Sequence, residues 1–128
     1  MPFDNPHQTP FGDIEILTDA RNRIASQNTW VKQRFRHGDR HCLVDALSLA
    51  SGSRSVDQPN RTERRLARVL AKQLSPGYRC WMRIALTPAR QRLIRFNDRP
   101  RTSHEDVMAL FDRTIDHLTT TVPANVAI

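Results

Sequence analysis

Apolar residues recur along this chain at intervals of three and four positions, which is the spacing of one face of an α-helix. The pattern is sharpest where Leu66, Val69, Leu70 and Leu74 share one face and cations occupy the other. The pair Thr87-Pro88 is a typical helix start. Helices are predicted over residues 13–27, 40–51, 61–74, 88–95 and 103–119. We therefore expect an all-α fold, a single small domain of four to five helices.

The segments outside these helices are rich in turn-forming residues. Residues 1–12 hold three prolines and are expected to form a flexible arm, residues 13–119 the helical domain and residues 120–128 a flexible tail. Gly38-Asp39 indicates a turn. Residues 78–86 alternate as a strand does, but no partner strand is evident. Helix or irregular structure is favoured there, and a strand remains the alternative.

Short polar residues stand at several predicted helix starts. Asp13 and Asn60 are suited to cap their helices, and Glu63 lies at capping-box spacing from Asn60. Thr102 stands in the same relation to Glu105. These pairs predict where the helices begin and assign the polar residues a backbone role.

Positive charge is concentrated in the middle of the chain. The 128 residues carry a formal net charge of +7, and residues 54–101 hold thirteen Lys and Arg against three acids. This balance favours an anionic partner, either nucleic acid or an acidic protein. A basic protein with simply solvated arginines would have the same composition, so the charge alone does not identify a partner.

The predicted contacts lie on the polar face of helix 61–74. Its cations are Arg61, Arg64, Arg65, Arg68 and Lys72, and Arg90, Arg92, Arg95, Arg99 and Arg101 could extend the patch. A guanidinium can contact phosphate through two hydrogen bonds, and the aromatic rings of Tyr78 and Trp81 could stack on unpaired bases. The sequence has no helix-turn-helix or RNA-recognition signature, so we expect little base specificity.

The alternative is a hydrolase or transferase that uses a cysteine and a histidine. Cys42 would be the nucleophile at a helix N-terminus, where the helix dipole can lower the pKa of a thiol. His104 would be the base, oriented by Asn97 or Asp98. Against this, Asn97-Asp98 followed by Arg-Pro is typical of a turn, and no known catalytic signature surrounds Cys42.

Metal and cofactor sites are not predicted. His37 and His41 have the spacing of one helical face, but Gly38 interrupts it and no further Cys or His pair completes a zinc site. Cys42 and Cys80 are too few for a disulfide scaffold and are expected to be reduced, although one bridge is an alternative. No secretory signal or membrane span is evident, so we expect a cytoplasmic protein without a membrane partner.

A third interpretation is an oligomerising or protein-docking helical module. Trp30, Phe35 and Trp81 would be its apolar anchors. This interpretation predicts an exposed apolar patch, and the oligomeric state is not predicted by the sequence.

Three segments resemble a small bacterial and phage family of unknown function, the domain-of-unknown-function family 6197. They are "NTWVKQRF" around Trp30, "HCLVDALSLA" and "FNDRPRTSHEDVMALFDRTI", and the resemblance covers roughly residues 14–118. The family pattern is matched by Phe96, Asn97, Asp98, Thr102, Glu105, Val107, Leu110 and Phe111. This chain departs from it by having Phe96 where Trp is more usual, and by a longer, more basic segment over 75–92. The resemblance implies a small helical domain and no particular activity.

Overall fold

A computed structural model describes residues 10–53, 58–74 and 88–121, and it confirms a mostly α-helical small domain. Its helices are α1 (Pro10–Arg23), α2 (Leu43–Ala50), α3 (Arg61–Lys72), α4 (Pro88–Asp98) and α5 (His104–Thr121), with a short 3-10 helix η2 (Gln27–Thr29). Two short antiparallel strands, β1 (Arg36–His37) and β2 (Arg40–His41), complete the described fold. Residues 78–86 lie outside the described residues, so their predicted structure stays a prediction.

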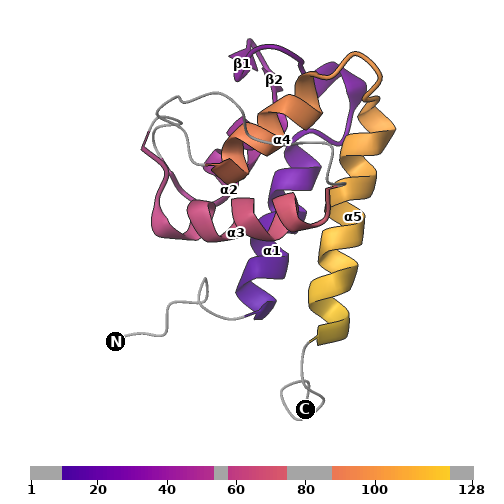
Figure 1. Ribbon diagram of the computed structural model, residues 1–128. Helices are drawn as coiled ribbons and strands as arrows, with labels where there is room; N and C mark the ends of the chain where they lie inside the picture. The colour runs from indigo at the N-terminus through magenta and orange to yellow at the C-terminus, as the bar shows by residue number, and fades with distance from the viewer. Residues whose placement is uncertain (1–9, 54–57, 75–87, 122–128) are drawn as a thin grey trace.

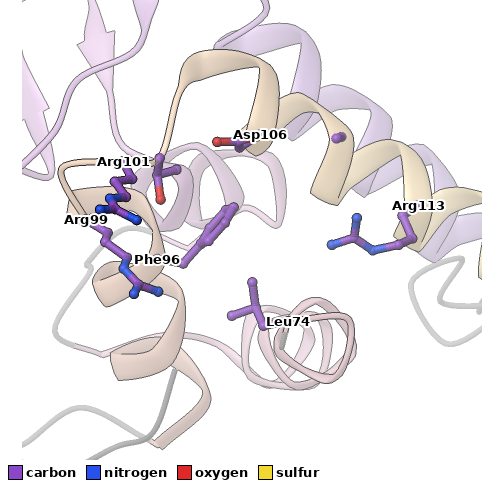
Figure 2. A pocket seen from close by; sticks show the side chains of 8 residues that line it. Leu74, Phe96, Arg99, Arg101, Asp106 and Arg113 are labelled. Carbon is purple, nitrogen blue, oxygen red and sulfur yellow. The ribbon is translucent and has the colours of Figure 1, made fainter. Parts of the chain in front are cut away.

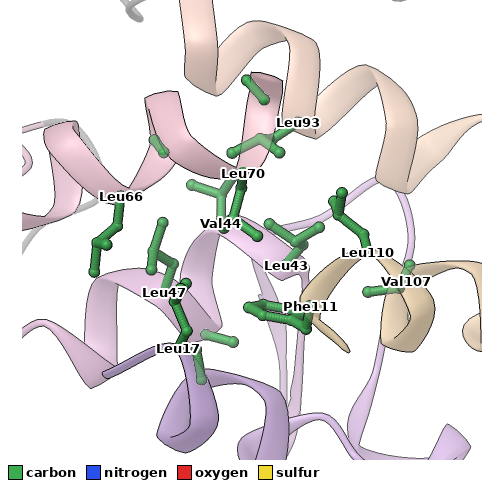
Figure 3. Packing of buried hydrophobic residues seen from close by; sticks show 14 of the residues in the cluster. Leu17, Leu43, Val44, Leu47, Leu66, Leu70, Leu93, Val107, Leu110 and Phe111 are labelled. Atoms are coloured by element: carbon green, nitrogen blue, oxygen red, sulfur yellow. The ribbon is translucent and has the colours of Figure 1, made fainter. Parts of the chain in front are cut away.

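Helix α2 lies at the centre of the core, because every residue from Leu43 to Ser48 is buried. Helices α1, α3 and α4 pack against it, and α1 and α5 lie side by side while α3 runs across their direction (Figure 1). Figure 3 shows fully buried side chains from all five helices: Leu17, Leu43, Val44, Leu47, Leu66, Leu70, Leu93, Val107, Leu110 and Phe111. The apolar faces predicted from helical spacing are therefore the faces that form this core.

The two-stranded hairpin was not predicted, because each strand has only two residues and no apolar alternation. Gly38-Asp39 does form the predicted turn, and Gly38 has φ of +61°, which suits the first central position of a type II′ turn. The hairpin is attached to α2 by Asp45, a buried carboxylate that contacts Arg36 Nε at 3.0 Å and His41 Nδ1 at 2.6 Å. Residues 40–42 therefore precede the second helix instead of belonging to it.

Several predicted boundaries are wrong by a few residues. Helix α1 begins at Pro10, so residues 10–12 are helical although they were assigned to a flexible arm. Helix α5 continues to Thr121, two residues into the predicted tail. Asp13 does not cap α1, because it lies within the first turn of the helix. Its carboxylate contacts Arg65 on α3 at 2.5 Å. None of the helices in the described part of the chain combines the length and apolar character that crossing a membrane requires.

The N-terminus of α3 is capped by the predicted residue, and the N-terminus of α5 is capped by a different one. Asn60 caps α3 as predicted, since its side chain accepts a hydrogen bond from Glu63 N at 2.8 Å. The start of α5 is capped by Ser103 and Asp106, which exchange side-chain to backbone hydrogen bonds of 3.2 and 2.9 Å. The predicted Thr102–Glu105 pair is therefore displaced by one residue, and Thr102 is buried instead.

Glu63 on α3 and Arg90 on α4 form an ion pair inside the protein. Their side chains are 0% and 1% exposed, and Glu63 Oε2 lies 3.2 Å from Arg90 Nε. Burial raises the pKa of Glu63, while the charge of Arg90 and the hydroxyl groups of Ser48 and Ser53 act to lower it. The pair joins the two helices at a point where solvent cannot replace either partner.

We predict that Arg90→Met destabilises the protein by about 3–5 kcal/mol, because it leaves a buried carboxylate without its cation. The double variant Glu63→Leu/Arg90→Met should recover most of this loss, since it removes both charges. Urea unfolding followed by circular dichroism measures both effects. The matched control is Arg68→Met on the exposed face of α3, which should change stability by less than about 0.5 kcal/mol. An Arg90→Met variant as stable as the wild type would contradict this role.

Candidate anion-binding surface and candidate catalytic residues

Four cations of α3 form a continuous exposed stripe, which we call the α3 basic stripe: Arg61, Arg64, Arg68 and Lys72. Their spacing of three and four residues places them on one side of the helix, over a length of about 16 Å at the rise of an α-helix. No carboxylate of the described residues forms an ion pair with any of the four. The stripe therefore presents cationic donors to solvent.

Arg65 differs from its four neighbours. Its side chain is 31% exposed and contacts the carboxylate of Asp13, which is only 13% exposed, at 2.5 Å. This ion pair connects α3 to α1. Arg65 was predicted to contact the anionic partner, but its charge is balanced within the fold, so we leave it out of the stripe.

The predicted extension of the patch onto the next helix is changed by the structure. Arg90 is buried against Glu63 and cannot meet a partner at the surface, so its assignment to the patch is wrong. Arg92 is half-buried and Arg95 is exposed, both on α4. Tyr78 and Trp81 lie outside the described residues, so their stacking role stays a prediction.

Cys42 is the N-cap of α2, and it is a free thiol. Its Sγ accepts a hydrogen bond from Asp45 N at 3.3 Å, and the residue is only 3% exposed. Burial raises the pKa of the Cys42 thiol to about 12, although backbone N–H groups at the start of α2 act in the opposite direction. The predicted lowering of the thiol pKa by the helix is thus outweighed by loss of hydration, which argues against Cys42 as a nucleophile.

His104 holds the start of α5 against the segment that follows α1. Its Nε2 donates a hydrogen bond to the carbonyl oxygen of Ile24 at 2.7 Å. Its ring packs on the indole of Trp30 with centroids 5.6 Å apart. Because a carbonyl only accepts, Nε2 carries the proton and is occupied by this contact. The Nε2 atom is therefore not available as a base in this arrangement.

Asn97 does not form the predicted turn, since it lies in the last turn of α4 and is completely buried. Its Oδ1 accepts hydrogen bonds from Trp30 Nε1 at 2.7 Å and from Leu43 N at 3.2 Å. Its Nδ2 donates to Val31 O at 3.0 Å. One amide thus connects α4 to the chain after η2 and to the first residue of α2.

Asp98 continues this connection and likewise does not orient His104 in the structure. Its Oδ1 accepts a hydrogen bond from Gln33 N at 2.6 Å and from Asn97 Nδ2 at 3.0 Å. Gln33 has φ of +64°, a left-handed conformation that is uncommon for a residue with a side chain. The carboxylate of Asp98 therefore holds a strained turn in place.

The histidines considered for a metal site lie on the hairpin and do not share a helical face. His37 is in β1 and contacts Arg34, while His41 is in β2 and donates to Asp45. Within the described ranges no three His, Cys, Asp or Glu side chains gather as metal ligands would. The structural role of Asp45 was not predicted, although a single acid within the apolar segment "LVDALSLA" indicates a buried carboxylate with a partner.

We predict that Asn97→Ala lowers the free energy of unfolding by about 2–3 kcal/mol, because it leaves the Trp30 and Leu43 N–H groups without their acceptor. The measurement is urea unfolding followed by Trp fluorescence. Asn22→Ala, an exposed position on α1, is the matched control and should shift stability by less than about 0.5 kcal/mol. Equal unfolding midpoints for Asn97→Ala and the control would contradict a central role for this amide.

We predict that Cys42 is inert in the folded protein at pH 8. A thiol with a pKa near 12 is mostly protonated there, so iodoacetamide should label it about a thousandfold more slowly than the same thiol in urea. Labelling should accelerate as pH rises toward 12. The free energy of unfolding should fall over the same pH range, because the thiol of the unfolded chain loses its proton at a lower pH than the buried thiol does. The experiment uses a Cys80→Ser variant, so that only one thiol reports. Fast labelling of the folded variant at pH 8 would restore the nucleophile interpretation.

Comparison with known proteins agrees with the resemblance of the three segments. A family model described as "Family of unknown function (DUF6197)" matches residues 9–117. No curated protein and no solved structure gives a significant match. The matched span contains Trp30, Asn97 and Asp98, whose contacts connect α2, α4 and the segment after η2. The chain therefore belongs to this family of unknown function, DUF6197.

Proposed function

We propose that this protein is a non-enzymatic binding module that contacts nucleic acid through the α3 basic stripe. The observation that carries the proposal is the run of four exposed cations on one helix face without a described carboxylate partner. A solvated helix surface usually mixes both signs of charge, and this one does not. An acidic protein could meet the same stripe, and competition with nucleic acid distinguishes the two partners.

The mechanism is neutralisation of backbone phosphates. Arg61, Arg64 and Arg68 each offer a guanidinium that can donate two parallel hydrogen bonds to one phosphate, and Lys72 offers an ammonium group. Such contacts release counterions from the nucleic acid and carry no base information. The proposed binding is therefore strongly dependent on salt and weakly dependent on sequence.

The enzyme alternative has less support from the described residues. Cys42 is buried with a raised pKa, and His104, Asn97 and Asp98 are occupied by contacts that hold the fold together. A binding surface needs none of these groups. We favour binding over catalysis for this reason.

The proposal predicts that single-stranded DNA binds and that its affinity falls by about 50-fold between about 50 and 200 mM salt, if all four cations contact phosphates. Fluorescence anisotropy with labelled oligonucleotides of two unrelated sequences measures this dependence. The variant Arg64→Gln/Arg68→Gln should weaken binding by about tenfold at the lower salt, because two phosphate contacts are lost.

The control removes the same charge elsewhere. Arg34→Gln/Arg40→Gln changes two exposed arginines of the hairpin region and should weaken binding by no more than about threefold, through long-range charge alone. Absence of binding at low salt, or equal losses in the two double variants, would overturn the proposal. Displacement of DNA by polyglutamate at equal charge would instead indicate an acidic protein as the partner.

A further inference from the structure

A pocket of about 470 Å³ lies between the end of α3, the end of α4 and the first half of α5. Its walls include Leu74, Phe96, Arg99, Arg101, Asp106 and Arg113 (Figure 2). The volume is within the range of sites that bind small molecules. The cations of the α3 basic stripe are not among the lining residues, so this pocket is separate from the proposed nucleic-acid surface.

The lining is strongly positive. Among the described lining residues, Arg99, Arg101 and Arg113 contribute three guanidinium groups and Asp106 contributes one carboxylate. The Asp106 carboxylate accepts the Ser103 N–H at 2.9 Å as part of the α5 cap, so it already has a structural partner. The described part of the lining therefore has more cationic than anionic side chains.

The guanidinium groups reach the pocket from two directions. Figure 2 shows Arg99 and Arg101 on the wall formed after α4, and Arg113 projecting from α5 on the opposite wall. Arg113 Nη2 donates to Gln73 O at 3.1 Å, which anchors the side chain and leaves further N–H groups of the same guanidinium for a ligand. Arg101 is exposed, and no ion pair engages it among the described residues.

The same pocket has an apolar part. Leu74, which follows the C-cap of α3, and Phe96 on α4 line it. Both residues belong to the core, at 8% and 7% exposure. Their side chains lie between the two arginine walls in Figure 2. A ligand here would place an anionic group near the arginines and an apolar group on Leu74 and Phe96.

We propose that this pocket binds a small phosphate monoester with an aromatic or aliphatic substituent. A phosphate monoester carries close to two negative charges at neutral pH and three acceptor oxygens, which match several guanidinium donors better than a single carboxylate does. The substituent removes apolar surface of Leu74 and Phe96 from water. The site would give the protein a small-molecule ligand besides any nucleic-acid partner.

Isothermal titration of the full chain with phenyl phosphate tests the site, with inorganic phosphate and benzoate as comparison probes. Phenyl phosphate should bind saturably with one site, and each comparison probe should bind about tenfold more weakly, because one lacks the apolar group and the other the second charge. Equal affinity for inorganic phosphate or for benzoate, or no saturable binding of phenyl phosphate, would overturn the proposal.

Two variants locate the binding in the pocket by independent means. Arg101→Gln removes one donor and should weaken phenyl phosphate binding by about tenfold. Ala109→Phe, at an exposed α5 position that lines the pocket, fills the space without changing charge and should abolish binding. Circular dichroism confirms that each variant is folded, and Arg101→Gln still tests the site if Ala109→Phe is not.

The matched control is Arg64→Gln/Arg68→Gln, which lowers the net charge on the α3 basic stripe and should leave phenyl phosphate affinity unchanged within about twofold. Equal loss in this control and in Arg101→Gln would show that net charge alone attracts the probe, and would overturn the pocket. Because DNA binding is measured on the stripe variants and phenyl phosphate binding on the pocket variants, either proposal can fail while the other stands.

Discussion

The described fold depends on the side-chain amide of Asn97. This one group accepts hydrogen bonds from Trp30 Nε1 and Leu43 N and donates to Val31 O, so it joins the end of α4 to two segments more than fifty residues earlier in the chain. At 0% exposure it cannot exchange these partners for water, and an apolar residue of the same size would leave the N–H groups of Trp30 and Leu43 without their acceptor. The next residue, Asp98, adds the bond to Gln33 N that holds a left-handed turn. The Asn-Asp pair that carries the family resemblance is therefore a structural joint between distant segments.

Charge is divided between interior and surface in a way that links the fold to the proposed function. Helix α3 has one acid, Glu63, and that acid faces inward to Arg90. Its exposed face is left with cations alone, because the only carboxylate of the helix is used in the core. Asp13 and Asp45 likewise meet Arg65 and Arg36 at the margins of the core. Arg65 and Arg90 each pair with an acid on another helix and so join two helices. The exposed cations of α3 without such a partner among the described residues form the α3 basic stripe.

The helices were predictable, and most of the contacts between them were not. Apolar spacing predicted α3 and α5 well, since a long amphipathic pattern has one consistent solution. Thr102 with Glu105 and Ser103 with Asp106 fit the capping rule equally, and burial of Thr102 decides between them.

Arg90 looked like a surface cation, because its partner Glu63 lies 27 positions away and local pattern does not report such pairs. Asn97 looked like a turn residue because its hydrogen-bond partners, Trp30, Val31 and Leu43, are also distant in the sequence. The hairpin was missed because its strands are held by Asp45 more than by their own pattern.

The distribution of hydrogen-bonding groups also bears on the choice between catalysis and binding. Proton transfer near neutral pH needs a group that can both gain and lose a proton there. The candidates for that role are occupied: Cys42 caps α2, His104 Nε2 donates to Ile24 O, and Asp98 accepts from Gln33 N. The α3 basic stripe and the walls of the pocket instead offer guanidinium and ammonium groups, which carry several hydrogen-bond donors and no acceptor. Groups of this kind can hold oxygen anions and fix their orientation, and they do not exchange protons with them. A surface built from them is therefore better suited to recognising phosphate than to transforming it.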